Sequence, residues 1–251
     1  VDVEYVRRWG MVGYDRDLER ASRSDRLGGS SAQPLIIKAT QAAGQYSAEI
    51  SALMLQEADF VHSSFWGGDM ESFMQQAKAR GMLAKQTAIL TTGETAMFRI
   101  PEQIPDGTVI GGRGPYGVFA PDNALNKWFR EQYFNRFNTW PTYPSYKMAQ
   151  AILGLKAAAE KAAAKNPKPS EADIIAALEY LEFDAPSGKV KMAIGKGHQA
   201  TQEMVYGRFK LQGGKPTIVD VVRYPAECVN PPDGVTSEQW IAQGFPGAKC
   251  N

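Results

Sequence analysis

Asp59-Phe-Val-His-Ser-Ser-Phe-Trp-Gly-Gly-Asp-Met-Glu-Ser-Phe-Met-Gln-Gln-Ala-Lys-Ala-Arg-Gly81 is the stretch from which the rest of the chain can be interpreted. It begins with the apolar pair Phe60-Val61, becomes polar at Ser63 and breaks at Gly67-Gly68. Beyond the break, apolar residues recur at helical spacing, namely Met70, Phe73, Met74 and Ala77. Gly81 then stands where a helix end favours a left-handed glycine. The stretch therefore predicts a strand, a glycine loop and a helix.

The same outline begins again after this helix. Thr87–Leu90 is a second apolar run, and it ends in the polar loop Thr91–Thr95. In an open α/β sheet, ligands collect at the carboxyl ends of the strands. We therefore expect the polar tips after Val61 and Leu90 to be neighbours and to form one wall of a cleft.

The composition is that of an ordinary globular protein. With 251 residues, the chain could bury one large core or two modest ones. The 28 basic and 27 acidic residues nearly cancel, so bulk charge does not favour nucleic acid or an anionic membrane as a partner. No apolar run is long enough to span a bilayer, and no signal peptide opens the chain. We expect a soluble protein that does not span a membrane.

The two cysteines, Cys228 and Cys250, lie in a loop-rich, proline-containing tail. In an oxidising compartment they could form one disulfide that pins the tail, and we favour this over two unrelated thiols. A metal site is poorly supported, because the only histidines, His62 and His198, are far apart in the sequence. We expect no metal, and we interpret His62 as a buried strand residue and not as a ligand.

Residues 1–44 are the least patterned part of the chain. Arginines are concentrated there, but acidic residues interleave with them and apolar periodicity is weak. A solvated, poorly ordered lead-in is the favoured interpretation, and an arginine-rich recognition arm is the alternative. Within this region, Pro34–Ile37 is consistent with a strand.

A glycine-rich segment follows a third predicted strand, Gly107–Ile110. It contains the pattern GxGxxG at Gly112, Gly114 and Gly117, but Pro115 interrupts it and no helix opens directly from the loop. A dinucleotide site needs such a helix, so we interpret the glycines as a crossover or hinge and expect no cofactor.

Helices and then strands make up the rest of the chain. An aromatic-rich helix is predicted from Asp122 to Phe137, and its ring stripe is expected to face the core. A long helix follows over residues 145–165, with Met148, Ala151, Ile152, Leu155 and Ala159 on one face. Ser170 should cap a further helix, and three strand-like runs lie between residues 190 and 222.

Taken together, these segments resemble the second half of a type I periplasmic binding protein, the branched-chain amino-acid type used by ABC importers. The resemblance runs from about Gln45 to Val222. Its motifs are Tyr46-Ser-Ala-Glu-Ile50, Ala58-Asp-Phe-Val61, Ser64-Phe-Trp-Gly-Gly-Asp69, Gln76-Ala-Lys-Ala-Arg-Gly81, Pro141-Thr-Tyr-Pro-Ser-Tyr146, Ala176-Ala-Leu178, Ala185-Pro-Ser-Gly188 and His198-Gln-Ala-Thr201.

The resemblance implies an α/β fold with two lobes, each a parallel sheet flanked by helices, that close on a ligand like a clamshell. Residues 45–113 and 203–251 would form the second lobe, and residues 114–202 the remainder of the first. Most of the first lobe would be missing or unrecognisable, with residues 1–44 as the lead-in.

The same resemblance implies that the chain is the substrate-binding component of an ABC transporter. It would capture a small polar or amphipathic solute, such as an amino acid, an amide or an aromatic acid, and deliver it to a membrane permease. A ligand-sensing regulator with the same clamshell is the alternative. An enzyme is not expected, because no GxSxG motif and no credible Cys-His pair is present. A monomer in the periplasm, or a secreted or lipid-anchored protein, would follow.

By position, the resemblance places ligand contacts in two loops, Ser63–Asp69 and Thr92–Glu94, and Tyr116 in the glycine segment is a further candidate. The candidates are Ser63, Ser64, Trp66, Gly67, Asp69, Thr92, Gly93, Glu94 and Tyr116. Trp66 offers a flat apolar face for stacking, or else a lid packed on its own lobe. Gly67 would let backbone amides approach closely. For Asp69 a helix N-cap is favoured over a ligand contact, whereas Glu94 could accept a hydrogen bond from an ammonium or a hydroxyl.

Overall fold

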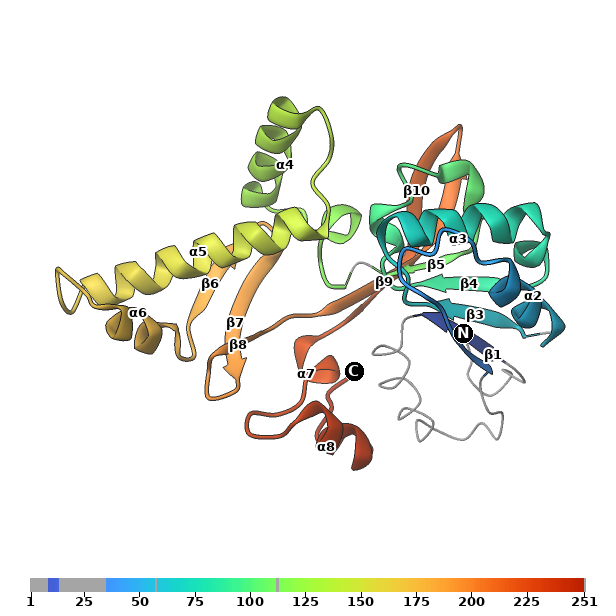
Figure 1. Cartoon of the computed structure of the whole chain (residues 1–251). Helices are drawn as coiled ribbons and strands as arrows, with labels where there is room; N and C mark the ends of the chain where they lie inside the picture. The colour runs from blue at the N-terminus through green and yellow to red at the C-terminus, as the bar shows by residue number, and fades with distance from the viewer. Residues whose placement is uncertain (1–8, 14–34, 57, 112, 251) are drawn as a thin grey trace. The chain divides into compact units, whose positions relative to one another are not determined.

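The computed structural model describes residues 9–13, 35–56, 58–111 and 113–250 (Figure 1). The chain divides into two compact units. Unit 1 comprises residues 1–112 and 206–222, and unit 2 comprises residues 113–205 and 223–251. The chain therefore passes from one unit to the other three times, and the first passage falls in the glycine segment that was interpreted as a crossover or hinge.

The end of the chain is grouped differently from the prediction, which joined residues 203–251 to residues 45–113. Residues 223–251 belong to unit 2 instead. Contacts made by two tail residues account for this grouping. The Arg223 guanidinium donates to the Phe119 carbonyl at 2.8 Å, and Asn230 Nδ2 donates to the Gln202 carbonyl at 3.1 Å. The assignment of the two units to named lobes stays a prediction.

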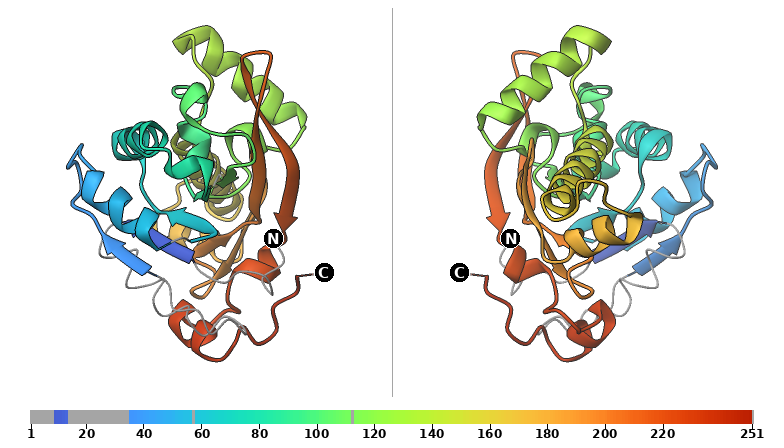
Figure 2. Two further views of the ribbon diagram at one scale, coloured as in Figure 1. Left: turned by 90° about the vertical axis from the view of Figure 1, so that its right-hand side faces the viewer. Right: turned by 90° about the vertical axis from the view of Figure 1, so that its left-hand side faces the viewer.

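Unit 1 is built on a seven-stranded sheet with the order β10-β9-β5-β4-β3-β1-β2. Strands β2, β1, β3, β4 and β5 are parallel neighbours, and β9 is antiparallel to β5. The hairpin β9–β10, orange to red in Figure 2, turns at Gly213-Gly214, where both glycines have positive φ. The strands are β1 Trp9–Gly13, β2 Leu35–Lys38, β3 Phe60–Ser63, β4 Thr87–Leu90, β5 Val109–Gly111, β9 Met204–Gln212 and β10 Lys215–Tyr224.

The prediction of a poorly ordered lead-in is wrong for residues 9–13. These residues form β1, which lies between β2 and β3, with Trp9 opposite Phe60 and Gly10 opposite Leu35. Backbone pairing with neighbours distant in sequence defines such short strands, and local periodicity does not reveal it. The strand expected at Pro34–Ile37 is confirmed over the described residues, while residues 1–8 and 14–34 lie outside them.

Helix α3, Gly67–Ala79, covers one face of β3, β4 and β5 (Figure 1). It buries the four residues whose spacing predicted it, Met70, Phe73, Met74 and Ala77. Gly81 follows in the left-handed conformation with φ 77°, as expected. The other helical elements of unit 1 are α2 Ser47–Leu55, η3 Met82–Ala84, η4 Gly93–Thr95 and η5 Pro101–Gln103.

Unit 2 contains two long helices and a small antiparallel sheet with the order β6-β7-β8. Ser170 caps α6 as predicted, because its Oγ accepts from the Asp173 amide at 3.2 Å in a reciprocal capping box. The elements are η6 Gly117–Phe119, α4 Ala124–Phe137, α5 Tyr143–Ala163, α6 Glu171–Leu178, β6 Glu182–Ala185, β7 Gly188–Ile194, β8 Gln199–Thr201, α7 Ala226–Val229 and α8 Ser237–Ala242.

The prediction that the aromatic stripe of α4 faces the core holds only in part: Phe129 is half-buried, with its ring centroid 5.0 Å from that of the buried Tyr146. The buried residue of α4 is Asn126, whereas Trp128 and Phe137 are more than half exposed. The rings instead pack on one another along the helix, with Tyr133 and Phe137 centroids 4.7 Å apart. On α5, three residues of the predicted apolar face, Met148, Ile152 and Leu155, are exposed as well.

Candidate functional site

Strand order defines one edge of unit 1 as the place where a ligand would bind. Strand β1 is flanked by β2 on one side and by β3 on the other, so the order of the strands reverses between β1 and β3. In doubly wound sheets, the carboxyl ends of the strands at such a reversal leave a crevice that holds ligands. Ser63 is the last residue of β3 and therefore lies at this point.

The loops after β3 and β4 are joined by hydrogen bonds. Ser63 lies opposite Leu90 in the parallel ladder, and Thr91 Oγ1 donates to the Ser63 carbonyl at 3.2 Å. Thr92 Oγ1 donates to the Phe65 carbonyl at 2.6 Å. The expectation that the two polar tips are neighbours is confirmed.

The two serines of the β3 loop differ in how their hydroxyl groups are used. Ser63 is fully buried, and its Oγ accepts from the Phe65 amide at 3.3 Å. Ser64 is 8% exposed, and among the described residues its Oγ is buried without a hydrogen-bond partner. A buried hydroxyl in this state costs about 1–3 kcal/mol, which a polar ligand atom would recover.

Helix α3 begins directly after this loop, at Gly67. Gly67 has φ 58°, and a Cβ added there would meet no atom within 4 Å, so glycine is needed for its conformation and not for space. The N-cap is Trp66, which provides no side-chain cap and is 51% exposed. The N-cap side chain therefore leaves the first-turn amides open to a ligand, and the Asp69 carboxylate lies in the same turn.

The prediction that Asp69 is the N-cap of this helix is wrong, because the N-cap is Trp66, three residues earlier. Asp69 lies in the first turn, and its Oδ2 accepts from the Ala42 amide at 2.9 Å. A carboxylate in the first turn is favourable beside the helix dipole. Asp69 thereby ties the segment before α2 to the start of α3.

A buried cluster of aromatic rings, which was not predicted from the sequence, packs around Phe65 of the β3 loop. Phe65 is fully buried between Tyr46 and Phe73, with ring centroids 4.9 Å and 5.3 Å away. Burial and the nearby Asp69 carboxylate raise the pKa of Tyr46, so its phenol stays neutral. The alternation of Phe65 with exposed Trp66 was the available signal, since one ring anchors the loop and the next faces outward.

The loop after β4 contains buried residues that hold the β3 loop and pack on β5. Thr92 is buried and holds the Phe65 carbonyl. A Cβ on Gly93 would lie 2.6 Å from Ile110 Cδ1, so this glycine permits close packing on β5. Glu94 is 1% exposed, whereas Trp66 of the first loop is 51% exposed. The ligand contacts expected for Thr92, Gly93 and Glu94 stay predictions.

Tyr116 belongs to unit 2, where it is fully buried. Its hydroxyl pairs with Gln202 Oε1 and lies 3.3 Å from Gln150 Oε1, and Gln150 Nε2 donates to Ser187 Oγ at 2.7 Å. Burial raises the pKa of its phenol. The network gives Tyr116 a structural role inside unit 2, and a contact with ligand stays a prediction.

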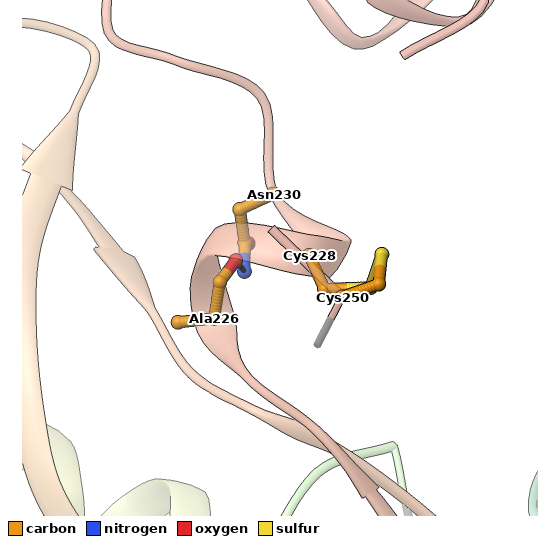
Figure 3. Close-up of a disulfide and its surroundings, with 4 residues drawn as sticks. All are labelled: Ala226, Cys228, Asn230 and Cys250. Atoms are coloured by element: carbon orange, nitrogen blue, oxygen red, sulfur yellow. Dashed lines mark hydrogen bonds between the residues drawn. A yellow bond between two sulfur atoms is a disulfide. The ribbon is translucent and has the colours of Figure 1, made fainter. Parts of the chain in front are cut away.

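The tail of unit 2 is closed by a disulfide between Cys228 and Cys250 (Figure 3). Asn230 Nδ2 donates to the Ala226 carbonyl at 2.8 Å beside it. The residues described by the structure include no group of three or more His, Cys, Asp or Glu that could hold a metal ion. Across the same residues, no helix combines the length and apolarity needed to cross a bilayer.

Comparison with known proteins identifies the family. The family model described as "Periplasmic binding protein" matches residues 4–215, and the chain belongs to this family. The predicted α/β fold of the type I periplasmic-binding-protein class is thereby confirmed. The comparison with curated proteins gives no match.

Solved structures of solute-binding proteins are similar in fold. One is from R. palustris in complex with 4-hydroxybenzoate, with a TM-score of 0.73 and 16% identity over 89% of this chain and 61% of its own. Another is a leucine-, isoleucine-, valine-, threonine- and alanine-binding protein from Brucella ovis, with a TM-score of 0.69 and 17% identity over 92% of this chain and 61% of its own. The chain thus spans about three fifths of the length of these relatives.

Proposed function

We propose that the chain is the solute-binding component of an ABC importer and that it holds a small carboxylate-bearing solute at the carboxyl edge of the unit 1 sheet. The observation that carries the proposal is the buried Ser64 hydroxyl, which has no hydrogen-bond partner among the described residues and lies just before α3, whose N-cap residue Trp66 provides no side-chain cap. A solute carboxylate would accept from the serine hydroxyl and from first-turn amides at the same time.

Trp66 adds an aromatic, apolar surface to the polar groups at this edge of the sheet. Trp66 stands between Ser64 and the first turn of α3 in the sequence, and its half-exposed ring could stack on a flat or apolar solute body. A carboxylate next to an aromatic or aliphatic group is common to the 4-hydroxybenzoate and the branched amino acids named for the similar structures. This chemistry supports an aromatic acid or an amino acid as the solute.

The mechanism of such a carrier is binding without conversion. Hydrogen bonds that are already oriented, together with removal of solute and site from water, would set the affinity. Delivery to a membrane permease and a periplasmic location follow from the family and are part of the proposal. The described site offers no nucleophile and base pair to transform the solute, and a role as carrier and not enzyme is proposed on that basis.

Thermal unfolding of the 251-residue chain in the presence of amino acids, amides and hydroxybenzoates tests this proposal. A bound solute at 100 times its Kd stabilises the folded chain by about 2.7 kcal/mol and should be recovered unaltered. Trp66→Ala should weaken binding, whereas Trp128→Ala, an equally exposed tryptophan on α4, should not. Chemical conversion of the solute, or no stabilisation by any of these compounds at millimolar concentration, would contradict the proposal.

A further inference from the structure

A cavity of about 310 Å³ lies in unit 1, at the edge of the sheet opposite to the candidate solute site. Asp59 and Gln86 belong to its lining and come directly before β3 and β4, so the cavity is at the amino ends of these strands. Pockets that hold small molecules have volumes of roughly 300–1,000 Å³, so the cavity is large enough for a small ligand. Its lining consists of Met54, Ala58, Asp59, Met82, Lys85 and Gln86.

Gln86 carries a buried acceptor atom that has no partner in the described part of the chain. The residue is 5% exposed, and its Nε2 donates to the Leu53 carbonyl of α2 at 2.9 Å. Because a carbonyl can only accept, this bond fixes which end of the side-chain amide is nitrogen. The other end, Oε1, is buried without a hydrogen-bond partner among the described residues. A donor held in the cavity would supply the missing hydrogen bond.

The rest of the buried lining is apolar and contains sulfur. Met82 is 1% exposed and Ala58 is 3% exposed, and Met54 of α2 is half-buried. Thioether sulfur makes favourable contacts with aromatic rings, and the flexible methionine side chain adapts to their shape. The two charged residues of the lining, Asp59 and Lys85, are exposed and of opposite sign. This lining favours a neutral aromatic body over an ion.

We propose that this cavity is a second ligand site, which binds a small neutral aromatic molecule with one hydrogen-bond donor, of the class of indole or phenol. The ring would lie against Met54 and Met82, and the donor would bond to Gln86 Oε1. Since the lining comes from α2, from η3 and from the residues before β3 and β4, the ligand stabilises the contacts between these elements. The inference does not depend on which solute binds at the carboxyl edge of the sheet.

Paired probes that differ by one donor test the proposal. Indole and 1-methylindole share a ring system, as do phenol and anisole, but the methylated member of each pair cannot donate. Isothermal titration calorimetry of the 251-residue chain should show saturable binding of indole or phenol, about fivefold or more tighter than that of the methylated partner. Equal affinities within both pairs, or no saturable binding of indole and phenol at millimolar concentration, would overturn the proposal.

Variants locate the bound probe. Met54→Ala removes one thioether from the lining and should weaken the binding of indole by about threefold or more, whereas Met148→Ala, on an exposed methionine of α5, should not. Gln86→Met removes the acceptor and should abolish the preference for indole over 1-methylindole. If this variant does not fold because the Leu53 carbonyl loses its donor, Met54→Ala still decides the outcome. Weaker binding by Trp66→Ala together with unchanged binding by Met54→Ala would place the probe at the solute site and overturn the proposal.

Discussion

Ser63 and Ser64 are adjacent, but replacing their side chains should change the stability of the fold in different directions. Ser64→Ala removes a buried hydroxyl that has no partner in the described part of the chain, so the free energy of unfolding without solute should stay equal or rise by up to about 1 kcal/mol. Ser63→Ala leaves the Phe65 amide without its acceptor and should lower that free energy by about 1–3 kcal/mol. Urea unfolding of both variants measures the difference.

Ser64→Ala should weaken solute binding although it does not lower the stability of the fold. Loss of a hydrogen bond to the carboxylate should weaken the affinity of Ser64→Ala about tenfold, which corresponds to roughly 1.4 kcal/mol. A variant that is both less stable and unchanged in affinity would show that Ser64 serves the fold and not the site.

His62 should make stability depend on pH. Burial lowers the pKa of its imidazole below the ordinary value of 6.5, so the folded chain keeps it neutral when the unfolded chain already binds a proton. As the pH falls below about 6.5, the free energy of unfolding should therefore decrease, by at most about 1.4 kcal/mol per pH unit for this one group. The contribution is absent above that pH. Thermal unfolding of wild type and His62→Gln from pH 7.5 to 5 checks this, and parallel curves would contradict it.

At the scale of an element, the start of α3 can be tested with two neighbouring glycines. Both have open space where a Cβ would be placed, but only Gly67 has a positive φ. Gly67→Ala should therefore cost about 1–2 kcal/mol of stability, while Gly68→Ala should be neutral or gain up to about 1 kcal/mol. Chemical denaturation compares them, and an equal loss in both would mean that space and not conformation selects glycine at the helix start.

Elements with a local cause were predictable from the sequence. The spacing of Met70 and Phe73 on α3, and the Ser170 cap of α6, act within a few residues of one another. Strand β1 was not predictable, since its pairing with β3 joins residues about fifty positions apart. On α5, periodicity identified an apolar face but could not show that Met148, Ile152 and Leu155 on it are exposed.

The location of the candidate site was also predictable from the sequence, but the roles of its residues were not. Its location followed from the polar ends of two predicted strands, and the bonds of Thr91 and Thr92 to the β3 loop confirmed that they meet. The roles of single residues did not follow. The burial of Glu94 and the position of Asp69 inside the first turn depend on where the helices begin, which sequence patterns fix only to within a few residues.

For the whole molecule, the Cys228–Cys250 disulfide should stabilise the tail of unit 2. It joins residues 22 apart in the sequence, for which loop closure contributes about 3 kcal/mol. Reduction with dithiothreitol should lower the urea midpoint of the native chain by a corresponding amount. A Cys228→Ser/Cys250→Ser variant should unfold at this lower midpoint with or without reductant, and a native midpoint unaffected by reduction would contradict the prediction.

The interleaving of the two units has a consequence for synthesis. Strand β5 receives its antiparallel neighbour β9 only after unit 2 residues 113–205 have been made. At ordinary translation rates of 5–20 residues per second, the edge of β5 would wait roughly 5–20 s on the ribosome for that partner. During this interval the nascent chain presents an open sheet edge, the kind of surface that holdase chaperones recognise and that misassembles when two growing polypeptides meet.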